Sequence, residues 1–239
     1  MRSRLSVHTA HGPIHGVLDH PPNARGLVVL ARAGRYLDAA EESTEQALVA
    51  AFLQASLAAF TIDLLTHQED RFPDAHNNVP VLSRRLLDCL ALAKRQLANE
   101  ALIETADFAS KLLTELQTEL RTELPIGLCG AGPTSPVVVR VAALRDHDIS
   151  AAVCRGGLID LAGTLYLRSL QAPLLLLVDA ADPHLLANSR RALQEVSCPC
   201  ELKSVASASG LEPMVHDAAR WFTQHFPNTG VHSTVLGET

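Results

Sequence analysis

The architecture of this 239-residue chain is most evident in the stretch Leu124-Pro-Ile-Gly-Leu-Cys-Gly-Ala-Gly-Pro-Thr-Ser135. Its first half is a short apolar run, which is typical of a buried strand over residues 125–129. A glycine-rich turn follows, and the apolar residues 136–144 predict a helix, since proline is favoured in the first turn of a helix. This sequence of strand, tight turn and helix places Gly132 at the apex of the turn.

Short apolar runs alternate with helical patterns on both sides of this stretch. The first two strands, at residues 5–8 and 14–18, are expected to form an antiparallel hairpin that turns at residues 11–13, and residues 66–78 are expected to be a polar surface loop. Further strands are expected at residues 26–31, 59–63, 149–154, 174–178 and 201–205, and helices at 41–57, 79–97, 106–120, 185–195 and 212–226.

This alternation predicts an α/β fold. We expect a mostly parallel, twisted sheet of about eight strands, with the first pair antiparallel and helices on both faces. A single domain is expected over residues 1–227, with a helical insertion around 98–120 and a polar C-terminal tail at 228–239.

Composition limits the classes of partner. The net charge of −6 and a pI near 6.0 argue against binding to nucleic acid or to anionic lipid. No run of about 18 apolar residues occurs, so no membrane span is expected. The N-terminus lacks the apolar region of a signal peptide, and five cysteines, an odd number, favour reduced thiols; we therefore expect a cytoplasmic protein.

Two groups of residues have the chemistry of metal ligands but not the spacing. Cys198-Pro-Cys200 is one residue shorter than a CxxC motif and has no second ligand pair. The polar loop carries potential ligands with no helical or strand spacing to focus them on one ion, namely His67, Glu69, Asp70, Asp74 and His76. We predict no metal and no cofactor.

Several segments together resemble the dienelactone-hydrolase-like branch of the α/β-hydrolases. The resemblance runs over nearly the whole chain and is best at residues 26–31, 125–132, 155–163 and 173–182. It implies the α/β-hydrolase fold. In such enzymes the tight turn is the nucleophile elbow, which carries a Ser or Cys at its apex.

Position by position, the catalytic residues implied by this resemblance are missing. Gly132 occupies the nucleophile position, and Gly210 occupies the position of the histidine base. Pro133 lacks the N–H that would supply half of the oxyanion hole. The other half of the oxyanion hole lies in a turn that here reads Arg32-Ala-Gly34-Arg35. Of the triad residues that the resemblance implies, Asp182 alone matches its position, that of the acid.

Alternative roles remain open for several of these residues. Cys129 and Ser135 are candidate displaced nucleophiles, although Cys129 is also typical of a buried strand thiol, and Ser135 of a helix cap. Asp182 precedes Pro183 and is equally well placed to cap a helix. Arg32 and Arg35 are either an anion-binding lip or solvated loop charges.

The main hypothesis is a catalytically degenerate α/β-hydrolase, a pseudoenzyme whose fold serves ligand binding or protein assembly. The expected ligand site consists of Arg32, Gly34, Arg35, Gly132 and Pro133. One alternative is an active ester or lactone hydrolase with its nucleophile at Ser135 or Cys129, and a second is a sensor or carrier for a small anionic ligand. A protein partner or a second copy of the chain is also possible through residues 79–120, where Leu112, Leu113, Leu116 and Leu120 would form an apolar face.

Overall fold

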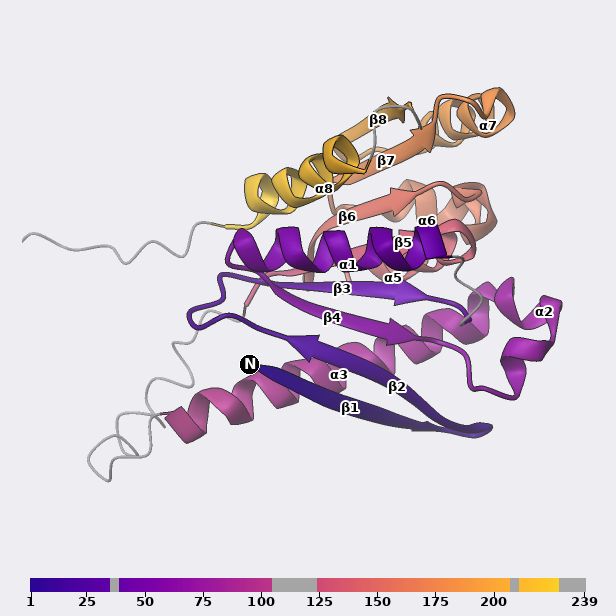
Figure 1. The fold of residues 1–239 in the computed structure, drawn as a ribbon. Coiled ribbons are helices and arrows are strands. Elements are labelled where there is room, and N and C mark those ends of the chain that lie inside the picture. Colours follow the sequence, from indigo (N-terminus) through magenta and orange to yellow (C-terminus); the bar gives the residue numbers. More distant parts are fainter. Residues whose placement is uncertain (35–38, 105–123, 207–210, 228–239) are drawn as a thin grey trace, which may run out of the picture.

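A computed structural model describes residues 1–34, 39–104, 124–206 and 211–227 of the chain. Their strands form one eight-stranded sheet in the order β1-β2-β4-β3-β5-β6-β7-β8 (Figure 1). The strands are β1 (Arg2–Thr9), β2 (Gly12–Asp19), β3 (Leu27–Arg32), β4 (Ala58–Asp63), β5 (Ile126–Ala131), β6 (Ile149–Arg155), β7 (Leu174–Asp179) and β8 (Cys200–Val205).

The predicted pairing of the strands is confirmed. β1 and β2 form an antiparallel hairpin, β2 also runs antiparallel to β4, and every other neighbouring pair is parallel. The carboxyl ends of the parallel strands therefore lie along one edge of the sheet, where ligands bind in open α/β sheets.

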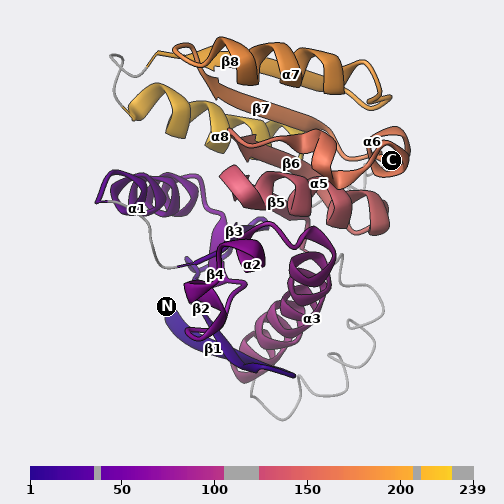
Figure 2. The ribbon, with the colours of Figure 1, turned by 90° about the vertical axis from the view of Figure 1, so that its right-hand side faces the viewer.

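Helices cover both faces of the sheet, as the alternating pattern predicts (Figure 2). One face carries α1 and α8, and the other carries α3, α5, α6 and α7. The helices are α1 (Ala39–Gln54), α2 (Pro73–His76), α3 (Val79–Glu104), α5 (Ser135–Leu144), α6 (Thr164–Ser169), α7 (Pro183–Leu193) and α8 (Glu212–His225), with short 3-10 turns η1 (Glu69–Arg71), η2 (Gly132–Thr134) and η3 (Ile159–Ala162).

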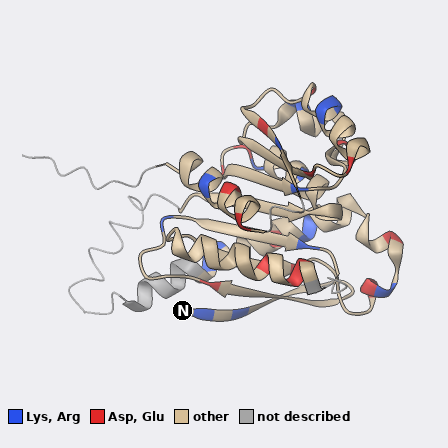
Figure 3. Cartoon of the chain, turned by 45° about the horizontal axis from the view of Figure 1, so that its top comes forward, with Lys and Arg blue, Asp and Glu red and all other residues tan. Residues whose placement is uncertain are grey.

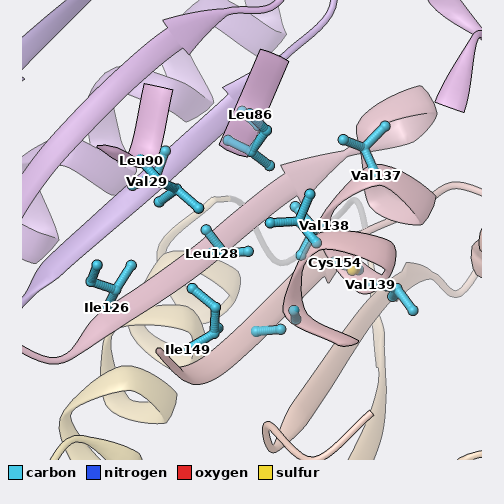
Figure 4. Packing of buried hydrophobic residues seen from close by; sticks show 14 of the residues in the cluster. Val29, Leu86, Leu90, Ile126, Leu128, Val137, Val138, Val139, Ile149 and Cys154 are labelled. Atoms are coloured by element: carbon cyan, nitrogen blue, oxygen red, sulfur yellow. The ribbon is translucent and has the colours of Figure 1, made fainter. Parts of the chain in front are cut away.

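Side chains that alternate along the central strands pack into the hydrophobic cores on the two faces of the sheet. In β3, Val29 and Ala31 belong to the cluster under α3 and α5, whereas Val28 and Leu30 belong to the cluster under α1 and α8. Figure 4 shows part of the first cluster, with Leu128 of β5 close to Val138 of α5. Strands buried on both faces read as continuous apolar runs, which is why the sequence identifies them.

The segment between β4 and α3 differs from its prediction. The expected loop at 66–78 contains η1 and α2, two helical pieces too short to show a helical period in the sequence. The following helix extends to Glu104, beyond the expected 79–97, and buries Leu82, Leu86, Leu90 and Ala93 against the sheet. The expected helix at 106–120, with its four leucines, and the expected tail at 228–239 lie outside the described residues.

No helix in the described ranges is long and apolar enough to span a membrane. In Figure 3 the acidic and basic residues are interspersed over the elements drawn in colour.

Candidate functional site

Strand β5 leads through a tight turn into helix α5. β5 ends at Ala131, η2 follows, and α5 begins at Ser135. The Thr134 hydroxyl accepts a hydrogen bond from the Ala131 amide (2.9 Å) and donates to the carbonyl of Ala31 in β3 (2.8 Å). The turn is thus fastened to the neighbouring strand, and the predicted arrangement of strand, turn and helix is confirmed.

Gly132 stands at the apex with φ of 51°, in the left-handed region. A Cβ added there would meet no atom within 4 Å, so the apex has room for a side chain that the sequence does not supply. Gly157 makes the close packing possible, because a Cβ on Gly157 would collide with the Gly132 carbonyl.

Ser135 is one of the two candidate displaced nucleophiles named from the sequence. Its side chain is fully buried, and the hydroxyl donates to the carbonyl of Gly156 (2.7 Å). The expectation that Ser135 caps a helix is wrong, since Ser135 is itself the first residue of α5 and its hydroxyl reaches across to the loop after β6.

Cys129 is a buried strand thiol, as the second of its two sequence interpretations predicts. It is 2 % exposed, and burial raises the pKa of the thiol to about 11, against the opposing effect of Arg155. A thiol with that pKa is protonated near neutral pH and is a poor nucleophile.

The turn after β3 is held by side chains from two other segments. The Gly34 amide donates to the Asp63 carboxylate (3.0 Å), and the His76 ring contacts the Ala33 carbonyl (3.0 Å) and the Asp70 carbonyl (3.1 Å). Gly34 has φ of 98°, and a Cβ there would collide with Asp70 and His76. The prediction that His76 is a solvated loop residue is therefore wrong.

Two arginines and two glutamates face each other above the ends of β3 and β6. Arg32 pairs with Glu45 (3.1 Å), and Arg155 pairs with Glu41 (3.3 Å). Burial raises the pKa of Glu45, while the charges of Arg32 and Arg155 oppose that rise. Arg32 is thus not a solvated loop charge, and Arg35 lies outside the described residues.

These residues surround a cavity of about 280 Å³ at the carboxyl ends of β3, β5 and β6. Four residues predicted for the ligand site line it: Arg32, Gly34, Gly132 and Pro133. The sequence prediction missed Glu41, Glu45 and Arg155. The one signal for Arg155 was its position directly after a buried strand.

Asp182 lies outside this cavity. It is exposed, and its carboxylate accepts a hydrogen bond from the Leu185 amide (2.8 Å) at the start of α7. It therefore acts as the helix cap that Pro183 predicts. Gly210 lies outside the described residues, and residues 207–210 of the sequence contain no histidine.

One carboxylate of the 66–78 segment forms an ion pair with helix α3. Glu69 pairs with Arg85 (2.6 Å); burial alone would raise the pKa of Glu69, but hydrogen bonds from Arg85 and Thr66 lower it to about 2. Within the described part of the chain, no group of three or more His, Cys, Asp or Glu side chains could hold a metal ion.

Comparison with curated proteins finds relatives that are longer than this chain. No protein-family model matches the chain. Two proteins from strains of Mycobacterium tuberculosis, each named "Putative phosphoribosyl transferase", are 30 % identical over 226 residues, which is 91 % of this chain and 45 % of theirs. The chain thus spans about half the length of the curated relatives it matches.

Comparison with solved structures finds hydrolases. A dienelactone hydrolase from Anabaena variabilis superposes with a TM-score of 0.73 at 24 % identity, covering 95 % of this chain and 99 % of its own. Est1E from Butyrivibrio proteoclasticus gives 0.66 at 12 % identity, covering 93 % and 98 %. The esterase domain of a Rhodothermus marinus protein gives 0.63 at 13 %, covering 95 % and 100 %. With its strand order and its elbow, the chain has the α/β-hydrolase fold.

Proposed function

We propose that this chain is a catalytically degenerate α/β-hydrolase that binds a small ligand in its elbow cavity and does not hydrolyse it. The observation that carries the proposal is Gly132: the apex of the elbow is in the left-handed conformation, with open space beside its Cα and no side chain to fill it. A fold does not specify its chemistry, which depends on the residues of the site.

Electrostatics at the apex support the same conclusion. A hydrolase stabilises the developing oxyanion with backbone N–H groups, one of them on the residue after the nucleophile. Pro133 occupies that position and has no N–H to donate. Loss of one oxyanion donor typically costs two to three orders of magnitude in rate (about 10²–10³).

The displaced-nucleophile alternative has little support from the geometry. Ser135 is fully buried with its hydroxyl committed to Gly156, and Cys129 is buried with a raised pKa. His76, the histidine that lines the cavity, directs its two ring nitrogens to the carbonyls of Ala33 and Asp70 rather than to either candidate.

The name of the mycobacterial relatives does not change this proposal. It describes proteins of which this chain matches 45 %, and the matching part has the α/β-hydrolase fold here.

A role in protein assembly is a weaker second candidate. Leu82 and Leu86 of α3 are fully buried within the chain, Leu87 and Leu92 are partly buried, and Val81 is exposed. Most of the described apolar side chains of α3 are therefore used within the chain. We also propose a reducing, cytoplasmic location, because all five cysteines are free thiols.

Hydrolysis of 4-nitrophenyl acetate and of a simple lactone tests the proposal. We expect rates equal to the buffer background, and no change in the Cys129→Ala and Ser135→Ala variants. Ester turnover that disappears in either variant would replace the proposal with the displaced-nucleophile enzyme.

A further inference from the structure

The connection between β6 and β7 is apolar on two sides. It contains η3 and α6 and reads Leu158-Ile-Asp-Leu-Ala-Gly-Thr-Leu-Tyr-Leu-Arg-Ser-Leu170. One set of its side chains packs into the core and is at most 2 % exposed, namely Ile159, Ala162, Leu167 and Leu170. A second set points outward: Leu158 is 42 % exposed, Leu161 54 % and Leu165 73 %. We call these three residues the leucine face.

The leucine face differs from ordinary scattered surface leucines, which need no explanation. Three of the eight exposed large hydrophobic side chains in the described part of the protein come from this stretch of eight residues. The buried side chains between them fasten the connection to the core, so the leucines stand on a fixed support. A helical segment that is apolar on all sides is normally covered on all sides, and this one therefore favours a partner.

The two flanks of the leucine face carry opposite charges. The connection lies between α5 and α7 in the helix layer, and η3 contacts both helices (Figure 2). On the α5 side, the Cζ atom of Arg140 lies 4.4 Å from the centroid of the Tyr166 ring. On the α7 side, the exposed carboxylate of Asp160 accepts a hydrogen bond from Asn188 (3.4 Å).

These two charges have no opposite charge beside them within the chain as described. Neither Arg140 nor Asp160 forms an ion pair with another residue in the described ranges. The cation of Arg140 rests on an aromatic ring, and the anion of Asp160 on a neutral amide. Both are therefore able to pair with a charge on a neighbouring molecule.

This arrangement of charges is self-complementary. In a two-fold dimer the same surface of both copies is in contact. A two-fold axis that runs along the connection, in the plane of contact, places the α5 side of one copy on the α7 side of the other. Leucines then pack against leucines, and Arg140 of each copy faces Asp160 of the other. A strongly acidic or strongly basic partner would instead meet a like charge on one flank.

We propose that two copies of this chain associate through the leucine face, with Arg140 of each copy opposite Asp160 of the other. An apolar centre bordered by tyrosine and arginine has the composition of the energetically important part of a protein interface. None of the three leucines lines the elbow cavity, so the inference goes beyond the proposed function and does not depend on it. It also uses a different surface from residues 79–120.

The size of the face sets the expected strength of the dimer. A standard interface buries about 800 Å² on each partner, and three leucines supply only its apolar centre. We therefore expect a dimer that forms at high micromolar concentrations and dissociates on dilution. Sedimentation velocity of the full chain over a series of concentrations should show a reversible change from monomer to dimer. A monomer at every concentration, or growth beyond the dimer, would overturn the inference.

Substitutions of the exposed leucines test the surface. Leu161→Ser and Leu165→Ser should each weaken dimerisation at least about tenfold, because each removes a buried leucine from both copies. Phe72→Ser is the matched control: Phe72 is 64 % exposed, precedes α2 and lies outside the leucine face, so dimerisation should not change. Equal effects of all three substitutions would contradict the assignment.

Thermal unfolding at a concentration where the wild type is monomeric separates a second copy from a covering segment of the same chain. The leucine variants should then unfold at the same temperature as the wild type, because the leucines are solvated in the monomer. A clearly lower unfolding temperature of Leu165→Ser under these conditions would show that its own chain covers the leucine, and the inference would be wrong.

Charge variants test the two-fold arrangement itself. Asp160→Arg makes both flanks positive and Arg140→Glu makes both negative, so each variant alone should dimerise several-fold more weakly than the wild type. An equal mixture of the two variants should regain dimerisation as a mixed dimer, since every contact between unlike copies then joins opposite charges. The mixture should lose this gain when Leu165→Ser is added to both chains. A mixture that associates no better than the separate variants would refute the pairing of Arg140 with Asp160.

Discussion

Adding a methyl group at the apex of the elbow gives the sharpest test of how the cavity is built. Gly132→Ala places a Cβ where no atom lies within 4 Å, so no steric cost is expected. The remaining cost is that of a left-handed alanine, about 1–2 kcal/mol, offset by about 0.4–1 kcal/mol from the loss of freedom in the unfolded chain. We expect a net destabilisation of about 1 kcal/mol.

Two neighbouring glycines provide matched comparisons. Gly156 also has positive φ, and a Cβ there would meet its nearest neighbour, Leu185, at 3.9 Å; Gly156→Ala should therefore cost about the same 1 kcal/mol. Gly157 has the same kind of backbone, but its Cβ would collide with the Gly132 carbonyl. Overpacking adds about 1–3 kcal/mol to the strain, so Gly157→Ala should cost about 3 kcal/mol.

Urea unfolding of the three variants, followed by circular dichroism, measures these differences as shifts of the midpoint at a constant slope. We expect the Gly132→Ala and Gly156→Ala variants to be equally stable, and the Gly157→Ala variant to be clearly less stable than both. A Gly132→Ala variant as unstable as Gly157→Ala would show that the apex has no room for a side chain. Gly132 could then not stand at a vacated nucleophile position.

Two further predictions concern residues outside the cavity. Asp182→Ala should lower the free energy of unfolding by about 1 kcal/mol through loss of the α7 cap, as measured by urea unfolding; an unchanged stability would contradict the assignment of Asp182 as the cap. Glu69 has a folded pKa of about 2 against an ordinary 4.5, so its contribution to stability is full above about pH 4.5 and is lost as the pH falls toward 2. Urea unfolding as a function of pH should therefore show that the wild type is more stable than Glu69→Gln by up to about 3 kcal/mol at neutral pH. This difference in the free energy of unfolding should shrink as the pH falls from 4.5 toward 2. A difference that does not change with pH would refute the role of the Arg85 pair.

The fold was largely predictable because its strands are local signals. Each buried parallel strand is a short apolar run, and the helices between them follow the helical period. The short helices at 69–71 and 73–76 could not be predicted, since three or four residues contain no period. The elbow was predictable for a related reason, because its strand, glycine turn and proline-initiated helix are consecutive in the sequence.

The ion pairs that line the cavity could not be predicted, because only the topology of the fold brings their members together. Glu41 and Glu45 are four residues apart on one helix, but Arg155 lies more than 100 residues later and joins them through the position of β6 beside β5. The role of Ser135 was mispredicted on similar grounds: its acceptor, the Gly156 carbonyl, is 21 residues away and belongs to the next loop.

The ion pairs that line the cavity also explain why the proposed site would not hydrolyse esters even with a serine at the apex. Hydrolysis needs donors aimed at the negative charge that develops on the carbonyl oxygen. Pro133 donates nothing, and the two guanidiniums that line the same cavity, those of Arg32 and Arg155, are already paired with Glu45 and Glu41. An oxyanion formed beside Gly132 would therefore enter a site whose positive charges are already compensated. The absence of a side chain at Gly132 and the charge arrangement of the cavity thus both support the proposed function, in which the site binds a ligand but offers little stabilisation to a tetrahedral transition state.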